Sequence, residues 1–140
     1  MHVERVRRDA KLTYLPFTAK AVATALRNFP HAKKLTLDDF YGGTFTITNP
    51  GPFGTLISGP IVNQPQVAIL SADGIKKRPV VVETLGDDDE ITVHPVGNLS
   101  LSFDHRAFDG AYAARFIGRT KQILEADDWT PEFAAQSPGA

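Results

Sequence analysis

His105 and Asp109 are the residues whose types and spacing most directly indicate acid–base chemistry. They stand four positions apart in the segment 102–110, which reads Ser-Phe-Asp-His-Arg-Ala-Phe-Asp-Gly. An imidazole has an ordinary pKa of about 6.5, so it can accept a proton near neutral pH. A nearby carboxylate can fix the tautomer of the ring or hold a supporting ion pair. The pattern therefore predicts a general base at His105, supported by Asp109.

Other interpretations account for the same two residues. Asp109 stands directly before a helical pattern, where an N-cap alone explains an aspartate. His105 alone can be a hydrogen-bonded turn residue. A shared metal ion is a third interpretation, but a catalytic zinc usually needs three protein ligands. The remaining histidines, His2, His31 and His94, lie far away in the sequence without ligand spacing. We therefore expect no metal site, and the first two interpretations stay open.

The motif sits between a predicted strand and a predicted helix. Apolar residues alternate with serines over 99–103, which is typical of a strand that ends just before His105. After Asp109, apolar residues recur at helical spacing over 113–124. A corner between two rigid elements is a place where catalytic groups are often held.

The other elements follow from the same periodicities. Apolar positions at helical spacing predict a helix over Phe17–Phe29, with Pro16 in its first turn and Pro30 at its end. Alternating or continuous apolar patterns predict four more strands: 44–48, 67–70, 80–83 and 91–93. The stretch 49–54 is too rich in Pro and Gly for regular structure. Helices at both ends of a mostly β middle predict an α+β fold with the helices on one face of a sheet.

Composition excludes several classes of protein. The 140 residues suit one compact domain. The absence of cysteine excludes disulfides, thiolate metal sites and a cysteine nucleophile. Lys+Arg number 15 and Asp+Glu 16, a balance that argues against a nucleic-acid binder. No window approaches about 20 consecutive apolar residues and no secretion signal is visible, so we expect a cytoplasmic protein that does not span a membrane.

The motif also carries a family resemblance. Residues 104–110 resemble the Asp-His-Arg-x-x-Asp-Gly signature of the dihydrolipoamide acyltransferase catalytic domain, the core of 2-oxo acid dehydrogenase complexes. Three further stretches resemble the same family in the same order: 11–21, 42–51 and 60–70. The resemblance implies a chloramphenicol-acetyltransferase-like α+β fold, in which a mixed sheet carries helices on one face.

The resemblance also implies a role for each site residue. His105 matches the family's general base, which takes the proton from the attacking thiol, and Asp109 matches a carboxylate that supports the active-site architecture. Thr48 matches a Ser or Thr whose hydroxyl stabilises the oxyanion of the tetrahedral intermediate. In the family this site lies between subunits of a trimer, so His105 and Thr48 are expected to come from different chains. Taken alone, Thr48 is equally an ordinary strand threonine that hydrogen-bonds to its neighbours.

The implied substrates and partners follow from the family. Coenzyme A is expected as a substrate, and the lipoyl group is expected in trans because neither a lipoyl domain nor a peripheral subunit-binding domain is visible. The expected partners are two further copies of the chain, or a larger trimer-based core, with the dehydrogenase and dihydrolipoamide dehydrogenase components of the complex. The resemblance leans slightly towards branched-chain complexes and assigns no residue to coenzyme A.

The chain departs from the family pattern after His31. Relatives carry several dozen further residues between Pro30 and Lys34, which help to line the thiol-substrate channel, so residues 1–140 are expected to form a single shortened catalytic domain. A non-catalytic trimeric assembly core is therefore one alternative function. A small-molecule O-acetyltransferase, similar to chloramphenicol acetyltransferase, is the other.

Overall fold

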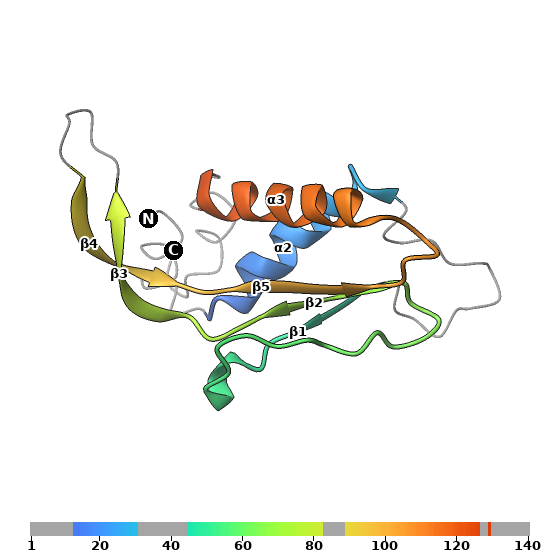
Figure 1. The fold of residues 1–140 in the computed structure, drawn as a ribbon, viewed down its shortest axis with the longest axis horizontal. Coiled ribbons are helices and arrows are strands. Elements are labelled where there is room, and N and C mark those ends of the chain that lie inside the picture. The colour runs from blue at the N-terminus through green and yellow to red at the C-terminus, as the bar shows by residue number, and fades with distance from the viewer. Residues whose placement is uncertain (1–12, 31–44, 83–88, 127–128, 130–140) are drawn as a thin grey trace, which may run out of the picture.

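Two helices lie on one face of a three-stranded sheet, and a two-stranded hairpin extends from one end of that sheet (Figure 1). The structure is a computed structural model that describes residues 13–30, 45–82, 89–126 and 129. Along the chain the elements are α2 (Leu15–Leu26), β1 (Thr46–Thr48), a 3-10 helix η3 (Gly51–Phe53), β2 (Ala68–Ala72), β3 (Lys76–Val82), β4 (Glu90–Val96), β5 (Leu99–Phe103) and α3 (Gly110–Ala126). The segment after His31, where a family segment is expected to be missing, lies outside the described residues.

Helix α2 confirms the predicted first helix but ends three residues earlier than Phe29. The amide of Asn28 donates to the carbonyl of Ala25 at 2.9 Å, and the amide of Phe29 donates to that of Leu26 at 3.3 Å. These tighter i→i−3 bonds close the helix in a turn. The cause is Pro30, because a proline ring disfavours the helical conformation of the residue before it.

The three-stranded sheet has the order β1-β2-β5. Strand β1 runs parallel to β2, and β5 runs antiparallel to β2. Every residue of β2 is buried, as its continuous apolar pattern predicts, although the strand begins at Ala68 and continues to Ala72. The sheet is therefore mixed, and its central strand is the one covered on both faces.

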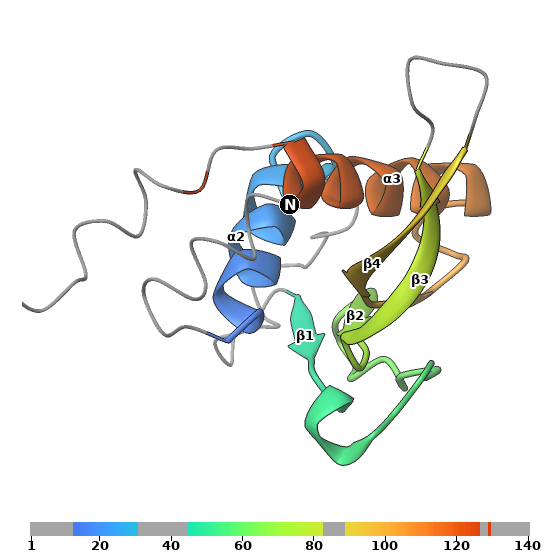
Figure 2. The same cartoon turned by 90° about the vertical axis from the view of Figure 1, so that its left-hand side faces the viewer.

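Helices α2 and α3 lie over the same face of the sheet (Figure 2), and the side chains of the core pack between these helices and β2. Phe17 of α2, Leu70 of β2 and Phe116 of α3 are at most 1% exposed. Trp129 is equally buried and packs edge-on against Phe17, with ring centroids 5.5 Å apart. Each such side chain contributes about 1.5–3 kcal/mol through burial, so these contacts fix α2 and α3 on one face of the sheet and confirm the α+β prediction.

The hairpin of β3 and β4 forms a sheet of its own. It confirms the predicted hairpin and extends it towards the sheet at both strands, with Lys76 opposite Val96 at its base. The stretch 49–54, predicted to be irregular, instead contains the 3-10 helix η3. Local interactions stabilise this 3-10 helix. The amide of Phe53 donates to the carbonyl of Pro50 at 3.0 Å, and Gly54 ends the turn with a positive φ of 87°.

Candidate active site

His105 lies in a tight turn between β5 and α3. The amide of Asp104 donates to the carbonyl of Val67 at 2.8 Å, which continues the pairing of β5 with the start of β2. The amide of Ala107 then donates to the carbonyl of Asp104 at 2.9 Å and closes the turn. His105 is exposed on this turn. The backbone that carries the imidazole is thus held at both ends while the side chain faces solvent.

An ion pair between Asp104 and Arg106 braces the same turn. The guanidinium Nη2 of Arg106 donates to Asp104 Oδ2 at 2.6 Å, and its Nε donates to Oδ1 at 3.0 Å. The Arg106 amide also donates to Oδ1 at 2.9 Å. The hydrogen bonds from the guanidinium, followed by that from the amide, lower the pKa of the Asp104 carboxyl to about 2. The same pairing raises the pKa of Arg106.

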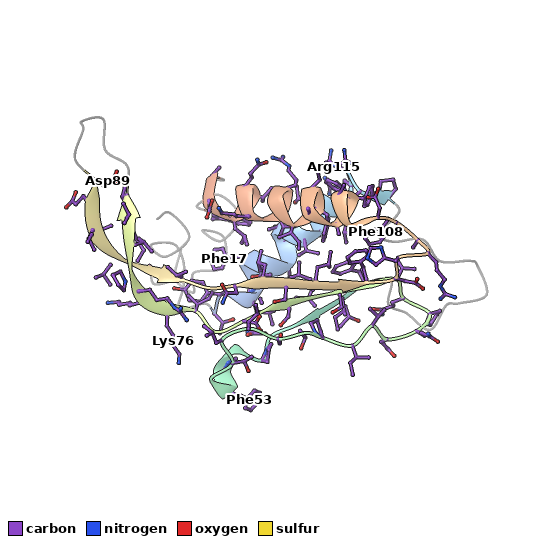
Figure 3. All side chains as sticks on the ribbon, viewed as in Figure 1. Phe17, Phe53, Lys76, Asp89, Phe108 and Arg115 are labelled. Carbon is purple, nitrogen blue, oxygen red and sulfur yellow. The ribbon has the colours of Figure 1, made fainter. Side chains whose placement is uncertain are left out.

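Aromatic rings support the imidazole from the core side. The rings of Phe103 and His105 have centroids 4.6 Å apart, and Phe108 stacks on Phe103 at 4.8 Å with an interplanar angle of 12°. Phe108, between the end of β5 and α3 (Figure 3), also contacts Tyr112 at 5.2 Å. Within the described residues the imidazole of His105 makes no hydrogen bond. The ring is therefore positioned by its packing against Phe103.

Asp109 caps helix α3. Its Oδ1 accepts from the amide of Tyr112 at 2.8 Å, and its carbonyl accepts from the amide of Ala113 at 3.1 Å. This is the N-cap geometry, in which a side-chain oxygen satisfies an amide of the first helical turn. In the described part of the chain, no hydrogen bond joins Asp109 to His105. The carboxylate thus fixes the start of the helix that follows the turn of His105.

Thr48 is the last residue of strand β1, and its side chain lies on the face of the sheet opposite the helices. Phe45 and Ile47 pack against the core, so the alternation of a strand directs Thr46 and Thr48 to the other face. The Thr46 hydroxyl donates to Gln66 Oε1 at 2.6 Å. The half-buried Thr48 makes no side-chain hydrogen bond within the described residues. Its hydroxyl is thus available as a donor.

The register of the sheet places Thr48 and His105 at opposite ends. Thr48 is aligned with Ser71, which is aligned with Ser100 on β5. His105 lies beyond the other end of β5, where Phe103 is aligned with Ala68. Three residues of strand alone span about 10 Å, so a single chain does not bring these two side chains together. The structure does unite His105 and Asp109 at one corner.

A buried carboxylate, Asp73, was not predicted from the sequence. It is 1% exposed and accepts hydrogen bonds from the hydroxyls of Ser58 at 2.7 Å, Ser71 at 3.0 Å and Ser100 at 3.1 Å. Burial raises its pKa, but these hydrogen bonds together with one from the Ser58 amide outweigh burial, so the pKa is lowered overall. The signal in the sequence is the acidic residue directly after a continuous apolar strand.

Among the described residues, no three His, Asp or Glu side chains lie close enough to hold a metal ion. None of the helices in that part of the chain is long and apolar enough to cross a bilayer.

Known proteins share both the sequence and the fold. Residues 31–131 match the family described as 2-oxoacid dehydrogenases acyltransferase (catalytic domain). The lipoamide acyltransferase component of the branched-chain alpha-keto acid dehydrogenase complex of Bacillus subtilis is 48% identical over 114 residues, which are 79% of this chain and 26% of that protein. The dihydrolipoyllysine-residue succinyltransferase component of the 2-oxoglutarate dehydrogenase complex of Buchnera aphidicola is 51% identical over 92 residues, 66% of this chain and 21% of that protein. The chain therefore spans about a quarter of the length of these relatives.

Solved structures agree with this assignment. A probable dihydrolipoamide acetyltransferase from Listeria monocytogenes superposes with a TM-score of 0.70 at 30% identity, over 86% of this chain and 74% of that one. The dihydrolipoamide acetyltransferase of Azotobacter vinelandii, solved to investigate a serine, a histidine and an asparagine in its catalytic mechanism, gives 0.54 at 36% identity over 74% and 41% of the two chains. The expected family and fold are both confirmed: the chain belongs to the catalytic-domain family of the 2-oxoacid dehydrogenase acyltransferases.

Proposed function

We propose that the chain is an acyltransferase domain that moves an acyl group between coenzyme A and dihydrolipoamide in a 2-oxo acid dehydrogenase complex. The observation that carries this proposal is the placement of His105, exposed and without a hydrogen bond in the described structure, on a braced turn inside the family motif. A rigid scaffold that presents one basic group to solvent is what proton transfer to a bound substrate requires.

In this mechanism His105 takes the proton from the attacking thiol. Thiols have an ordinary pKa of about 8.5, so a neighbouring base raises the thiolate fraction at neutral pH. The thiolate sulfur forms a bond to the thioester carbonyl carbon, and the carbonyl oxygen becomes an oxyanion. The Thr48 hydroxyl donates to that oxygen, an interaction worth about 2.7–4 kcal/mol in comparable sites. The intermediate collapses, the other sulfur leaves as a thiolate, and His105 returns the proton to it.

The spacing of the motif supports these roles. In the Azotobacter protein the histidine and the asparagine studied for catalysis are four residues apart. His105 and Asp109 have the same separation. Asp109, as an N-cap, acts as a positioning residue at the end of the same turn. An asparagine can make the same cap, so either residue type at this spacing can fix the start of the helix.

The distance between Thr48 and His105 supports a site shared by two subunits. Because the register places them at opposite ends of one sheet, one complete site needs His105 from one protomer and Thr48 from its partner. A closed ring of identical subunits provides such a heterologous contact at each interface. The family resemblance implies a ring of three, so we propose a homotrimer, alone or as the unit of a larger core that binds the dehydrogenase and dihydrolipoamide dehydrogenase components. A similar structure is the cubic core of the pyruvate dehydrogenase multienzyme complex, with a TM-score of 0.54 at 38% identity, over 74% of this chain and 41% of that one.

For the acyl group we propose a branched chain. The match to the Bacillus branched-chain relative extends over 114 residues, against 92 residues for the Buchnera succinyltransferase. A panel of isobutyryl-, succinyl- and acetyl-coenzyme A tests the preference. The highest kcat/KM for succinyl- or acetyl-coenzyme A contradicts the branched-chain preference. An acyl transfer to small alcohols that exceeds the transfer to dihydrolipoamide contradicts dihydrolipoamide as the acceptor and indicates a small-molecule O-acetyltransferase.

The activity is tested with His105→Ala. Acyl transfer from acyl-coenzyme A to dihydrolipoamide is measured for the wild type and for the variant. Loss of a general base is expected to lower kcat by about 10²–10⁴-fold. Arg115→Ala, an exposed position on α3 (Figure 3), is the matched control and retains the wild-type rate. Equal rates for His105→Ala and the wild type contradict the assigned base, and a trimer without any transfer indicates an assembly core.

A further inference from the structure

Asp73 is a buried carboxylate for which the proposed mechanism has no use. It lies directly after β2 and has no ion pair in the described part of the chain. Its charge is compensated by four hydrogen bonds: three from serine hydroxyls and one from the Ser58 amide at 3.1 Å. A charge that is buried without a cationic partner is costly unless such donors surround it. The cluster of Asp73 with Ser58, Ser71 and Ser100 is thus a specific arrangement.

The cluster joins three segments of the chain. Ser71 belongs to β2 and Ser100 to β5, whereas Ser58 lies in the loop that follows Thr48. Ser58 makes the closest contacts, because its hydroxyl lies 2.7 Å from Asp73 Oδ1 and 2.7 Å from Ser71 Oγ. The carboxylate therefore ties this loop to the two neighbouring strands.

The loop 49–58 has few other attachments. It runs beneath the sheet, on the face opposite the helices (Figure 1). The Gly74 amide donates to the carbonyl of Thr55 at 2.9 Å, and Asn98 Nδ2 donates to the carbonyl of Leu56 at 2.7 Å. The backbone of Gly51 lies so close to that of Gly74 that a Cβ on Gly51 would meet Gly74 Cα at 2.9 Å. The bonds that hold the loop therefore converge on the corner formed by Asp73, Gly74 and Asn98.

Thr48 adjoins this loop along the chain and Ser71 across the sheet. It precedes the loop by one residue and is aligned with Ser71 in the parallel pairing of β1 and β2. Aligned residues of neighbouring strands point to the same face of a sheet, so Thr48 and Ser71 share the face that holds the Asp73 cluster. Asp73 therefore holds Ser71, which is the strand neighbour of Thr48, and the loop 49–58, which follows Thr48 in the chain.

We propose that Asp73 is a positioning residue for Thr48, holding the loop 49–58 and Ser71 so that the Thr48 hydroxyl keeps its catalytic position. This inference rests on the proposed function. An oxyanion donor acts at about 2.7–3.1 Å, and small displacements at a reacting centre are costly in rate. A hydroxyl at the end of a three-residue edge strand needs such an anchor, because its own strand pairs on one side only within the described residues.

The test compares Asp73→Asn and Ser58→Ala with the matched control Ser100→Ala. The control removes one hydrogen bond to the same carboxylate but leaves the loop attached. We expect Asp73→Asn and Ser58→Ala to lower kcat about tenfold with little change in either KM. Ser100→Ala is expected to keep kcat within about twofold of the wild type while lowering thermal stability. Ser58→Ala removes only one hydroxyl, so it serves if Asp73→Asn does not fold.

A double-mutant cycle separates positioning from a general loss of stability. If Asp73 acts through Thr48, then Asp73→Asn causes no further loss of kcat in a Thr48→Ala background. If the two losses multiply, or if Asp73→Asn and Ser58→Ala keep the wild-type kcat, the proposal is wrong.

Amide hydrogen exchange gives a readout that does not need activity. Asp73→Asn is expected to speed exchange in a peptide covering 49–58, and Ser100→Ala is expected to leave that peptide unchanged. Unchanged exchange in Asp73→Asn overturns the anchoring. A wild type that transfers no acyl group overturns the proposed function, and with it the catalytic role of Asp73, even where the exchange result shows that the loop is anchored.

Discussion

The turn that carries His105 depends on one pair of side chains, Asp104 and Arg106. The Arg106 side chain is 85% exposed, so the pair contributes little to global stability in water. Its effect is local, because the guanidinium and the amide of Arg106 both reach the Asp104 carboxylate. This geometry holds the backbone turn at His105.

The Asp104 titration tests this arrangement. The pKa of Asp104 in the folded protein is about 2, below the ordinary value of 3.8. The bracing is therefore fully present above the ordinary pKa and is lost as the pH falls through about 2. We expect Arg106→Ala to raise the pKa of Asp104 towards its ordinary value of 3.8, because the hydrogen bonds from the guanidinium are lost. Carboxyl NMR chemical shifts against pH measure both values.

Lys121→Ala is the control for that titration. Lys121 pairs with Glu125 at 3.9 Å on the exposed face of α3, so its removal is expected to leave the pKa of Asp104 unchanged. A wild-type Asp104 that titrates near its ordinary pKa would show that the ion pair does not persist in solution.

At the scale of elements, Asp109 sets where α3 begins. Its Oδ1 accepts from the Tyr112 amide at 2.8 Å. We expect Asp109→Ala to lower the free energy of unfolding by about 1 kcal/mol, the usual value of an N-cap. Asp109→Asn keeps the acceptor oxygen and is expected to cost a few tenths at most. Urea unfolding at one fixed protein concentration measures both variants, and equal losses for the two would contradict a cap.

Periodicity predicted the elements because each segment buries one face. The apolar spacing of 17–29 and 113–124 located α2 and α3, and alternation over 99–103 located β5. Periodicity does not encode register, so it did not predict that Thr48 and His105 lie at opposite ends of the sheet. The motif names His105 and Asp109 as candidate site residues, and their roles stay a prediction.

Asp73 was not predictable because its importance comes from partners that are distant in the sequence. Ser58 and Ser100 lie 15 and 27 positions away from it. Only folding brings their hydroxyls to one carboxylate. The end of α2 was also predicted wrongly, since the effect of Pro30 on the preceding turn competes with the apolar spacing that continues to Phe29.

At the scale of the molecule, the segment of the chain that follows Thr48 exposes large apolar side chains. Phe53 and Ile61 are each 90% exposed, and Ile57 is 69% exposed. Phe53 points away from the sheet (Figure 3). Exposed apolar clusters of this kind mark contacts with other proteins. These exposed side chains begin five residues after Thr48. Their position supports the proposal that a neighbouring copy covers them and presents its own His105 to Thr48.

Mixed assemblies test that arrangement directly. Thr48→Ala and His105→Ala are each expected to lower kcat by about 10²–10⁴-fold, because every site of such a homotrimer lacks one group. If each site takes the two groups from neighbouring subunits, random co-assembly of equal amounts restores both groups in about a quarter of the sites. Acyl transfer is measured after joint unfolding and refolding, and again after simple mixing of the preassembled variants, with the subunit composition determined by native mass spectrometry. An acyl-transfer rate above those of the two single variants is expected after joint refolding and not after simple mixing. If mixed trimers form but transfer acyl groups no faster than the single variants, then no site combines His105 of one subunit with Thr48 of its neighbour, and the shared site is wrong.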